Sequence, residues 1–328
     1  MLNHHYQPIL FRTALLLVCV ALLPIAVGAL VTTMHAGMAF YDWPSSDGYG
    51  MLSYPWLKSA GDKFVEHGHR LAGMLVGIVT IIFTVVFFRK ESRLWMKACV
   101  VLILLAVIVQ GLLGGARVLQ DQPKWALVHF NFAAIVFTGM VSIAFFSSKS
   151  WFDSAERFRS ANSPTKVGFA VLLPLAFLVP LAIYGQMILG GIERHFYIMR
   201  DRHVEMALLV TLCVLTNLVI AWKSGYDWLR RPATLLAVLV LSQGMLGAGA
   251  WLTKYGWPPA GYVAEQGSVS AKIVQSTHAI AAMFLLATSV VYLLRVVRLN
   301  HLMNAQPQIS HLRNSSCQTS LTVGGGVS

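Results

Sequence analysis

Residues 64–88 read FVEHGHRLAGMLVGIVTIIFTVVFF, a polar opening followed by an apolar run with no charge after Arg70. A helix needs about 20 consecutive apolar residues to cross a bilayer, and this stretch is long enough. The chain has 328 residues, of which 56% are hydrophobic and 12% charged. Those charges are too few to cover a soluble surface. The sequence therefore predicts an all-α, polytopic membrane protein.

Hydropathy predicts about eight transmembrane helices. They cover roughly residues 11–32, 64–88, 98–117, 125–146, 167–190, 204–222, 234–252 and 271–294. We expect an N-terminal four-helix half at 10–147, a cytoplasmic linker at 148–166, a C-terminal four-helix half at 167–295 and a disordered polar tail at 300–328.

Internal repeats predict two tandem, pseudo-symmetric four-helix bundles. Residues 23–27 (LPIAV) resemble 179–183 (VPLAI), and 110–115 (QGLLGG) resemble 243–248 (QGMLGA), with a further echo at 186–191 (QMILGG). Close helix packing through small residues is the main role expected for these glycines. That role is compatible with a flat ligand nearby.

Charge predicts the orientation in the membrane. With the N-terminus inside, the cytoplasmic segments hold 15 of the 25 Lys and Arg residues but only four of the 13 acids. This bias places both termini in the cytoplasm, and a bacterial inner membrane fits best. The net charge of +12 is thus explained by topology. No basic run or aromatic-interleaved patch indicates nucleic-acid binding.

Four histidines recur near the starts of the even-numbered spans, each followed four residues later by Gly or Ala. The pairs are His69/Gly73, His129/Ala133, His203/Ala207 and His278/Ala282. Residues i and i+4 share a helix face, so each pair offers an imidazole beside a flat patch suited to a planar ring. Any single histidine could instead be an interfacial polar residue. Together they predict haem or metal ligation at two sites; zinc is disfavoured because no partnering cysteines are present.

The second span differs chemically from the other three. One face of this helix carries an acid, a candidate ligand, a cation and a position without a side chain: Glu66, His69, Arg70 and Gly73. Glu66 could move protons or stabilise a developing cation. Alternatively it is a solvated interfacial acid or a salt-bridge partner of Arg70.

Other polar residues allow weaker predictions. Basic residues at outer helix ends could bind haem propionates or simply snorkel to the interface; they are Arg70, Arg117, Arg194, Arg200, Arg202 and Lys254. The outer-loop residues His35 and 42–44 (DWP) could cap a substrate pocket, or form a turn with an interfacial Trp. We expect solvated roles for His67 and His195.

These motifs together resemble the heme A synthase family. The resemblance covers about residues 10–295 and rests on Glu66-x-x-His69-Arg70, the Gln-x-x-Leu-Gly phrases, the later histidines and the outer run 36–44 (AGMAFYDWP). It implies an oxidoreductase that converts the C8 methyl group of heme O to a formyl group, giving heme A for heme-copper oxidases. Some members carry a cysteine pair in an outer loop, whereas residues 34–63 contain no cysteine. A thiol relay in that loop is therefore excluded.

The resemblance also implies roles for individual residues. His69 and His129 would face the substrate iron, with Glu66 as catalytic carboxylate and Arg70 beside it. His203 and His278 would bind the iron of a resident haem b that relays electrons. The expected partners are heme O, membrane lipids, the farnesyltransferase that produces heme O, a heme-copper oxidase and an unidentified electron donor.

Two alternatives remain open. A dihaem b-type, quinone-linked electron-transfer protein would use all four histidines for permanent haems and would not need Glu66. A transporter built on repeats would use histidines as proton or metal relays, but its helices should then be broken by Gly or Pro at the site. Here the glycines lie at the span ends.

Overall fold

The computed structural model describes residues 5–160, 169–265 and 267–322. Within these ranges eight helices are long and apolar enough to cross a membrane. They are α1 (Pro8–Thr33), α2 (Gly61–Lys90), α3 (Leu94–Gln120), α4 (Pro123–Phe146), α7 (Phe169–Phe196), α8 (Arg200–Lys223), α9 (Asp227–Tyr255) and α10 (Val269–Thr322). The predicted fold class and the predicted number of spans are confirmed, and the chain is a multi-pass membrane protein.

Local sequence explains where several helices begin and end. Pro8 and Pro123 occupy the first turns of α1 and α4, where the missing N–H costs nothing and the fixed φ suits a helix. Arg89 and Lys90 lie in the last turn of α2, where cations interact favourably with the helix dipole. These polar turns extend the helices beyond the apolar stretches that hydropathy detects.

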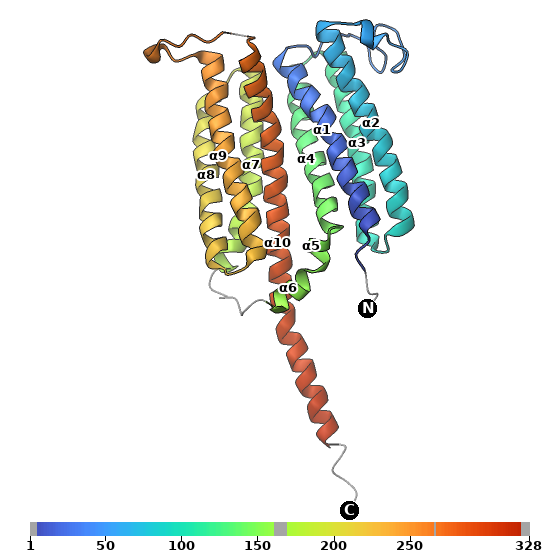
Figure 1. Ribbon diagram of the computed structural model, residues 1–328, viewed down its shortest axis with the longest axis vertical. Helices are drawn as coiled ribbons and strands as arrows, with labels where there is room; N and C mark the ends of the chain where they lie inside the picture. Colours follow the sequence, from blue (N-terminus) through green and yellow to red (C-terminus); the bar gives the residue numbers. More distant parts are fainter. Residues whose placement is uncertain (1–4, 161–168, 266, 323–328) are drawn as a thin grey trace, which may run out of the picture.

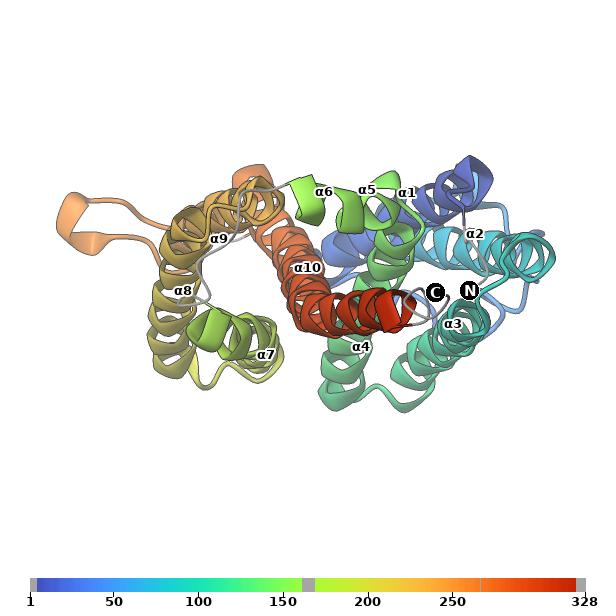
Figure 2. The ribbon, with the colours of Figure 1, turned by 90° about the horizontal axis from the view of Figure 1, so that it is seen from below.

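The eight helices form two bundles, seen side by side in Figures 1 and 2. In the first bundle α1, α2, α3 and α4 each contact the next helix, and α4 also contacts α1. The helices α7, α8, α9 and α10 form the second ring in the same order. Between bundles α4 contacts α10, α1 contacts α10 and α4 contacts α7. A twofold axis relating α1–α4 to α7–α10 would produce this set of contacts.

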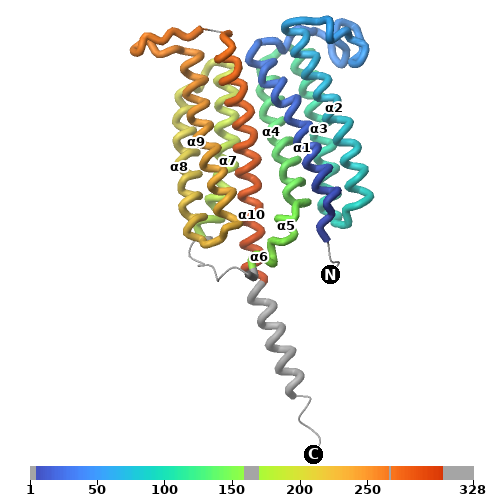
Figure 3. Tube along the Cα trace, in the orientation of Figure 1, coloured from blue at the N-terminus to red at the C-terminus, as the bar shows by residue number. Residues whose placement is uncertain are grey.

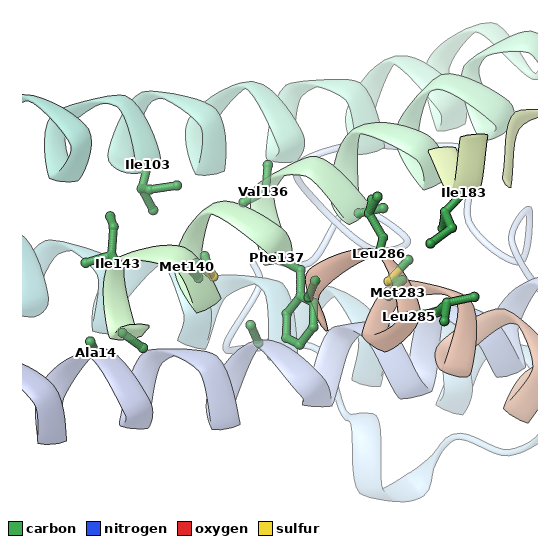
Figure 4. Packing of buried hydrophobic residues seen from close by; sticks show 14 of the residues in the cluster. Ala14, Ile103, Val136, Phe137, Met140, Ile143, Ile183, Met283, Leu285 and Leu286 are labelled. Atoms are coloured by element: carbon green, nitrogen blue, oxygen red, sulfur yellow. The ribbon is translucent and has the colours of Figure 1, made fainter. Parts of the chain in front are cut away.

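The two bundles share a continuous apolar core, part of which Figure 4 shows. The rings of Phe137 on α4 and Phe284 on α10 meet edge to face, with centroids 5.6 Å apart. Met140 and Met283 are buried nearby. Because lipid tails are as apolar as these side chains, tight packing rather than the hydrophobic effect holds the bundles together.

The long connections between helices lie at one end of the molecule. Residues 34–60, which include η1 (Trp56–Lys58), and residues 256–265, which include η3 (Pro258–Ala260), project at the same end in Figures 1 and 3. The start of α1 lies at the other end, together with α5 (Lys149–Phe152) and α6 (Ser154–Ser160). The histidine-bearing ends of α2, α4, α8 and α10 therefore share one side.

Two predicted segments differ from the structure. The linker expected at 148–166 contains α5 and α6 up to Ser160, and its residues 161–168 lie outside the described part of the chain. The helix α10 continues to Thr322, so the backbone of 300–322 is helical where the sequence predicted a disordered tail. Polar composition lowers hydropathy without removing helix propensity. The last predicted tail residues, 323–328, lie outside the described part.

Candidate functional site

The structure brings the four histidines together in two pairs. His69 on α2 and His129 on α4 have ring centroids 6.3 Å apart, at an interplanar angle of 78°. His203 on α8 and His278 on α10 have centroids 6.5 Å apart, at 86°. Each bundle therefore holds one pair of nearly perpendicular imidazoles, and no pair crosses between bundles.

The spacing within each pair fits two axial ligands of one iron. A transition metal lies about 2 Å from an imidazole nitrogen, and that nitrogen lies about 1 Å from its ring centre, so two rings on opposite sides of one metal have centroids about 6 Å apart. The observed separations agree with this value. The Nδ1 atoms of His69, His203 and His278 are buried without a hydrogen bond. Among the described residues, no three His, Cys, Asp or Glu side chains form a group that could hold a metal ion.

Each histidine ring packs against a glycine of the facing odd-numbered helix. An added Cβ atom would lie very close to the Cε1 atom of the facing histidine at each of these glycines. The separations are 2.7 Å for Gly28 and His69, 3.2 Å for Gly114 and His129, 2.8 Å for Gly190 and His203, and 3.2 Å for Gly247 and His278. Separations this short leave no comfortable room for a side chain. These glycines therefore make space for the imidazoles, a specific role beyond the helix packing that the repeats predicted.

Three glutamines complete the histidine environments. The Nε2 atoms of Gln110, Gln186 and Gln243 donate to the backbone carbonyls of His129, His203 and His278 at 3.1, 2.8 and 2.9 Å. Each glutamine precedes its ring-packing glycine by four residues, so both lie on one helix face. The recurring Gln-x-x-Leu-Gly phrase was visible in the sequence, but only the packing of the helices shows that it faces the histidines.

A cavity of about 460 Å³ lies beside the first histidine pair. Its wall includes His69, His129, Glu66 and the open surface of Gly73, where an added Cβ would meet no atom within 4 Å. Most of the remaining lining is apolar. Residues of the second bundle also reach the wall: Arg194, His195, Ala279, Ile280 and Met283. The cavity therefore spans the boundary between the bundles.

Glu66 and Arg70 form a buried ion pair at the cavity wall. Arg70 Nη2 lies 2.7 Å from Glu66 Oε1, and the two side chains are 6% and 4% exposed. The backbone N–H of Ala39 donates to Glu66 Oε2 at 2.7 Å. Of the alternatives for Glu66, the structure shows the salt bridge and not a solvated acid.

The same ion pair anchors the outer loop. Arg70 Nη1 donates to the carbonyls of Asp42 and Ser45 at 2.9 and 2.6 Å. Trp43 packs on Gly115, where an added Cβ would lie 2.6 Å from its ring. Trp43, Pro44 and Met51 line the cavity, so this loop forms part of its wall.

His67 and His195 differ from the solvated roles predicted for them. His67 is 1% exposed, and its Nδ1 lies 2.9 Å from the hydroxyl of Ser46. It faces the folded outer loop, which hydropathy could not place. His195 is half-buried and lines the cavity.

The candidate propionate ligands separate into two groups. Arg70 binds Glu66 at 2.7 Å and Lys254 binds Glu193 at 2.8 Å. The exposed Arg200 and Arg202 also lie beside acids. Arg117 and Arg194 line the cavity instead. Arg194 donates to the Thr33 hydroxyl, and among the described residues Arg117 has no ion-pair partner. The cavity thus holds two cations without a carboxylate of their own.

Sequence comparison points to one family for this region. Residues 58–202 match the family described as cytochrome oxidase assembly protein. The chain is 33% identical over 138 residues to the heme A synthase of Methylobacterium radiotolerans, covering 38% of this chain and 37% of that protein. The heme A synthase of Halalkalibacterium halodurans is 32% identical over 111 residues, 33% of this chain and 36% of that protein.

A third relative gives the same result. The heme A synthase of Rhizobium rhizogenes is 28% identical over 134 residues, 38% of this chain and 36% of that protein. The matched part thus spans a little over a third of the length of these relatives. The family match includes Glu66, His69, Arg70 and His129 and ends one residue before His203.

Proposed function

We propose that this chain, whose residues 58–202 match the cytochrome oxidase assembly protein family, is a heme A synthase. The activity would be oxidation of the C8 methyl group of heme O to a formyl group. One observation carries the proposal: both bundles hold a histidine pair at the spacing of axial ligands, and the nearly buried ion pair of Glu66 and Arg70 lines the cavity beside the first pair. The acid near His203, Glu193, is instead held by Lys254 and Tyr255. In this proposal the first site is reactive and the second only binds a haem.

We assign the substrate to the first bundle and a resident haem b to the second. His69 and His129 would bind the iron of heme O, and His203 with His278 would bind the iron of haem b. The support is the cavity of about 460 Å³ beside His69 and His129. When bound, haem b would supply electron transfer to the substrate site.

The residues around the cavity have separate tasks in this proposal. Glu66 would hold a proton or steady positive charge close to the reacting methyl group. Arg70 keeps this carboxylate in place through the bond at 2.7 Å. Arg117 and Arg194 would bind the two propionates, because guanidinium groups suit carboxylates.

The outer loop would limit the access of water to the cavity. Trp43, Pro44 and Met51 form part of the cavity wall, and residues 34–60 project at this end of the molecule (Figure 1). Excluding water strengthens the electrostatic interactions inside the pocket. The loop therefore contributes to the chemistry although it supplies no ligand.

The setting of the enzyme follows from the charge bias. We propose a bacterial inner membrane, with both termini in the cytoplasm and the histidines near the outer side. The farnesyltransferase that makes heme O and a heme-copper oxidase are proposed as partners upstream and downstream.

The orientation can be tested with the variants Asp201→Cys and Lys149→Cys. Only the cysteine at position 201 should react with a membrane-impermeant thiol reagent in intact cells.

Co-expression with a source of heme O tests the activity. Extracted haems are identified by mass for the parent and for Glu66→Gln. The parent should yield heme A, and the variant heme O or a partly oxidised haem. A parent that leaves heme O unchanged while it holds two b haems would instead be a dihaem electron-transfer protein.

The assignment of haem b is tested separately. His278→Ala should lose the resident b-type absorption spectrum while the protein remains in the membrane. An unchanged spectrum would refute the placement of haem b in the second bundle.

A further inference from the structure

Three of the four histidines share one arrangement, and the fourth departs from it. His129, His203 and His278 each face a Gln–Gly pair, defined here as a glutamine and the glycine four residues later on the facing helix. His69 faces Gly28, but the residue four positions earlier is Pro24. The substrate site therefore has one complete and one incomplete histidine environment.

The glutamine holds its histidine in two ways. Its Nε2 binds the histidine carbonyl and thereby ties the two helices together at the level of the ring. The glutamine side chain also lies beside the ring: Gln110 Nε2 is 3.2 Å from His129 Nδ1, and Gln186 Nε2 is 3.4 Å from His203 Nε2. Groups that orient a metal-binding histidine from outside commonly strengthen the metal site.

His69 has no such glutamine. Among the described residues no side chain donates to its carbonyl, unlike the carbonyls of the other three histidines. Its unpaired Nδ1 is shared with His203 and His278 and does not set it apart. Pro24 has no N–H, so α1 also loses one internal backbone hydrogen bond at this level, which makes the helix easier to bend. Both effects weaken the hold on His69 from the α1 side.

The backbone of α2 is nevertheless well anchored. Arg70 binds two outer-loop carbonyls, and Glu66 accepts the N–H of Ala39. Any release of His69 therefore involves its ring and the neighbouring α1, not a shift of α2. The acid beside the ligand can stay in position while the ligand moves.

We propose that His69 is the more labile of the two ligands of the substrate iron, and that Gln110, Gln186 and Gln243 hold the other three histidines more firmly. This inference rests on the proposed function. A substrate haem must enter and its product must leave, so both of its iron–histidine bonds break and form again in every cycle, and the less firmly held His69 would leave first. The resident haem has no such need, and both of its histidines have complete Gln–Gly pairs.

Carbon monoxide binding tests the proposal on the full-length protein carrying both haems. In the reduced protein, carbon monoxide can bind an iron only after an axial histidine has left. We expect one haem of the parent to bind it readily and the other slowly. Pro24→Gln should slow the fast phase about tenfold, because outer partners of ligating histidines change metal affinity by about 10–100-fold. Pro24→Ala, which restores the N–H without an amide side chain, is the matched control.

The converse variant acts on the resident haem. Gln186→Leu removes the partner of His203 and should make the second haem react with carbon monoxide about tenfold faster, with the fast phase unchanged. The proposal is overturned if Pro24→Gln behaves like Pro24→Ala, or if Gln186→Leu leaves the slow phase unchanged. A protein that follows these expectations but forms no heme A would disprove the synthase activity and not the ligand assignment.

Discussion

At the scale of single residues, the histidine rings fit between the helices only because the facing residue is glycine and has no side chain. Gly190 packs against His203, whereas Gly185 on the same helix meets only the end of Met206, 3.6 Å from an added Cβ. Of the two, only Gly190 belongs to the Gln-x-x-Leu-Gly phrase. Their different neighbours give them different tolerance to substitution.

Gly190→Ala should displace the ring of His203, because the added Cβ would lie 2.8 Å from Cε1. We expect a severalfold loss of haem from the second bundle, measured as haem per protein after purification. Gly185→Ala is the control and should retain the parent haem content. Equal haem content in both variants would contradict the role given to Gly190.

The ion pair of Glu66 and Arg70 gives a second prediction at this scale. Arg70→Ala leaves a buried carboxylate without its cation, a change that typically costs about 3–5 kcal/mol. It also removes the two bonds to the outer loop. We expect residues 34–60 to become readily cleaved by protease in detergent. Lys63→Ala breaks the exposed pair with Asp47 and should change little.

At the scale of elements, the outer loop contains hydrogen bonds that depend on the charge of Asp42. The amides of Asp47 and Gly48 donate to Asp42 at 3.0 and 2.9 Å. Burial raises the pKa of Asp42, but its hydrogen bonds with Ser45, Gly48 and Asp47 outweigh burial and lower the pKa below the ordinary value of 3.8. The ionised form therefore stabilises the folded loop.

The pH dependence follows from that sign. The contribution of Asp42 is fully present above pH 3.8 and is lost as the pH falls through the lower pKa of the folded state. Cleavage of residues 34–60 by pepsin should rise steeply only below that range. Asp42→Asn should weaken the loop at higher pH and flatten the dependence. A parallel profile in both proteins would argue against Asp42 as the titrating group.

The helix α10 contains a buried tyrosine whose hydroxyl group has no hydrogen-bond partner among the described residues. Tyr292 is 0% exposed, and its hydroxyl has no hydrogen-bond partner among the described residues. Removing an unpaired buried hydroxyl relieves a desolvation cost of about 1–3 kcal/mol. Tyr292→Phe should therefore raise the midpoint of thermal unfolding. A lower midpoint would indicate a hydrogen bond to a bound water.

At the scale of the whole molecule, the cavity joins the two bundles. Arg194 belongs to α7 but hydrogen-bonds to Thr33 of α1 and lines the cavity beside His69. Neither bundle alone completes this wall. The packing of the two bundles thus produces one shared pocket in addition to two separate histidine pairs.

Arg194→Leu should weaken heme O binding in the first bundle although the residue lies in the second. We expect about a tenfold loss of affinity if a charge-assisted hydrogen bond to a propionate is removed, measured by haem titration. The b-type spectrum of the second bundle should persist. Arg202→Leu, which removes an exposed cation paired with Glu205, is the control. A spectrum lost together with affinity would point to a general folding defect.

Local sequence alone determined the number of spans, the end of the molecule that carries the histidines and the singular stripe of Glu66, His69 and Arg70. Hydropathy and helix periodicity are local properties, and a residue's depth in the membrane follows from its position along one helix. The pairing of histidines was predicted only through family resemblance and repeat symmetry. Nothing local to α2 specifies α4 as its partner.

Tertiary structure decided which faces of the helices meet. The phrase containing Gln110 and Gly114 could be read from the chain, but its contact with His129 depends on how α3 is rotated against α4. The sequence repeat aligned Pro24 with Pro180, whereas the packing places Pro24 where Gln186 stands relative to the histidine. Helix rotation and register are set by contacts between segments far apart in the chain, so no single stretch contains them.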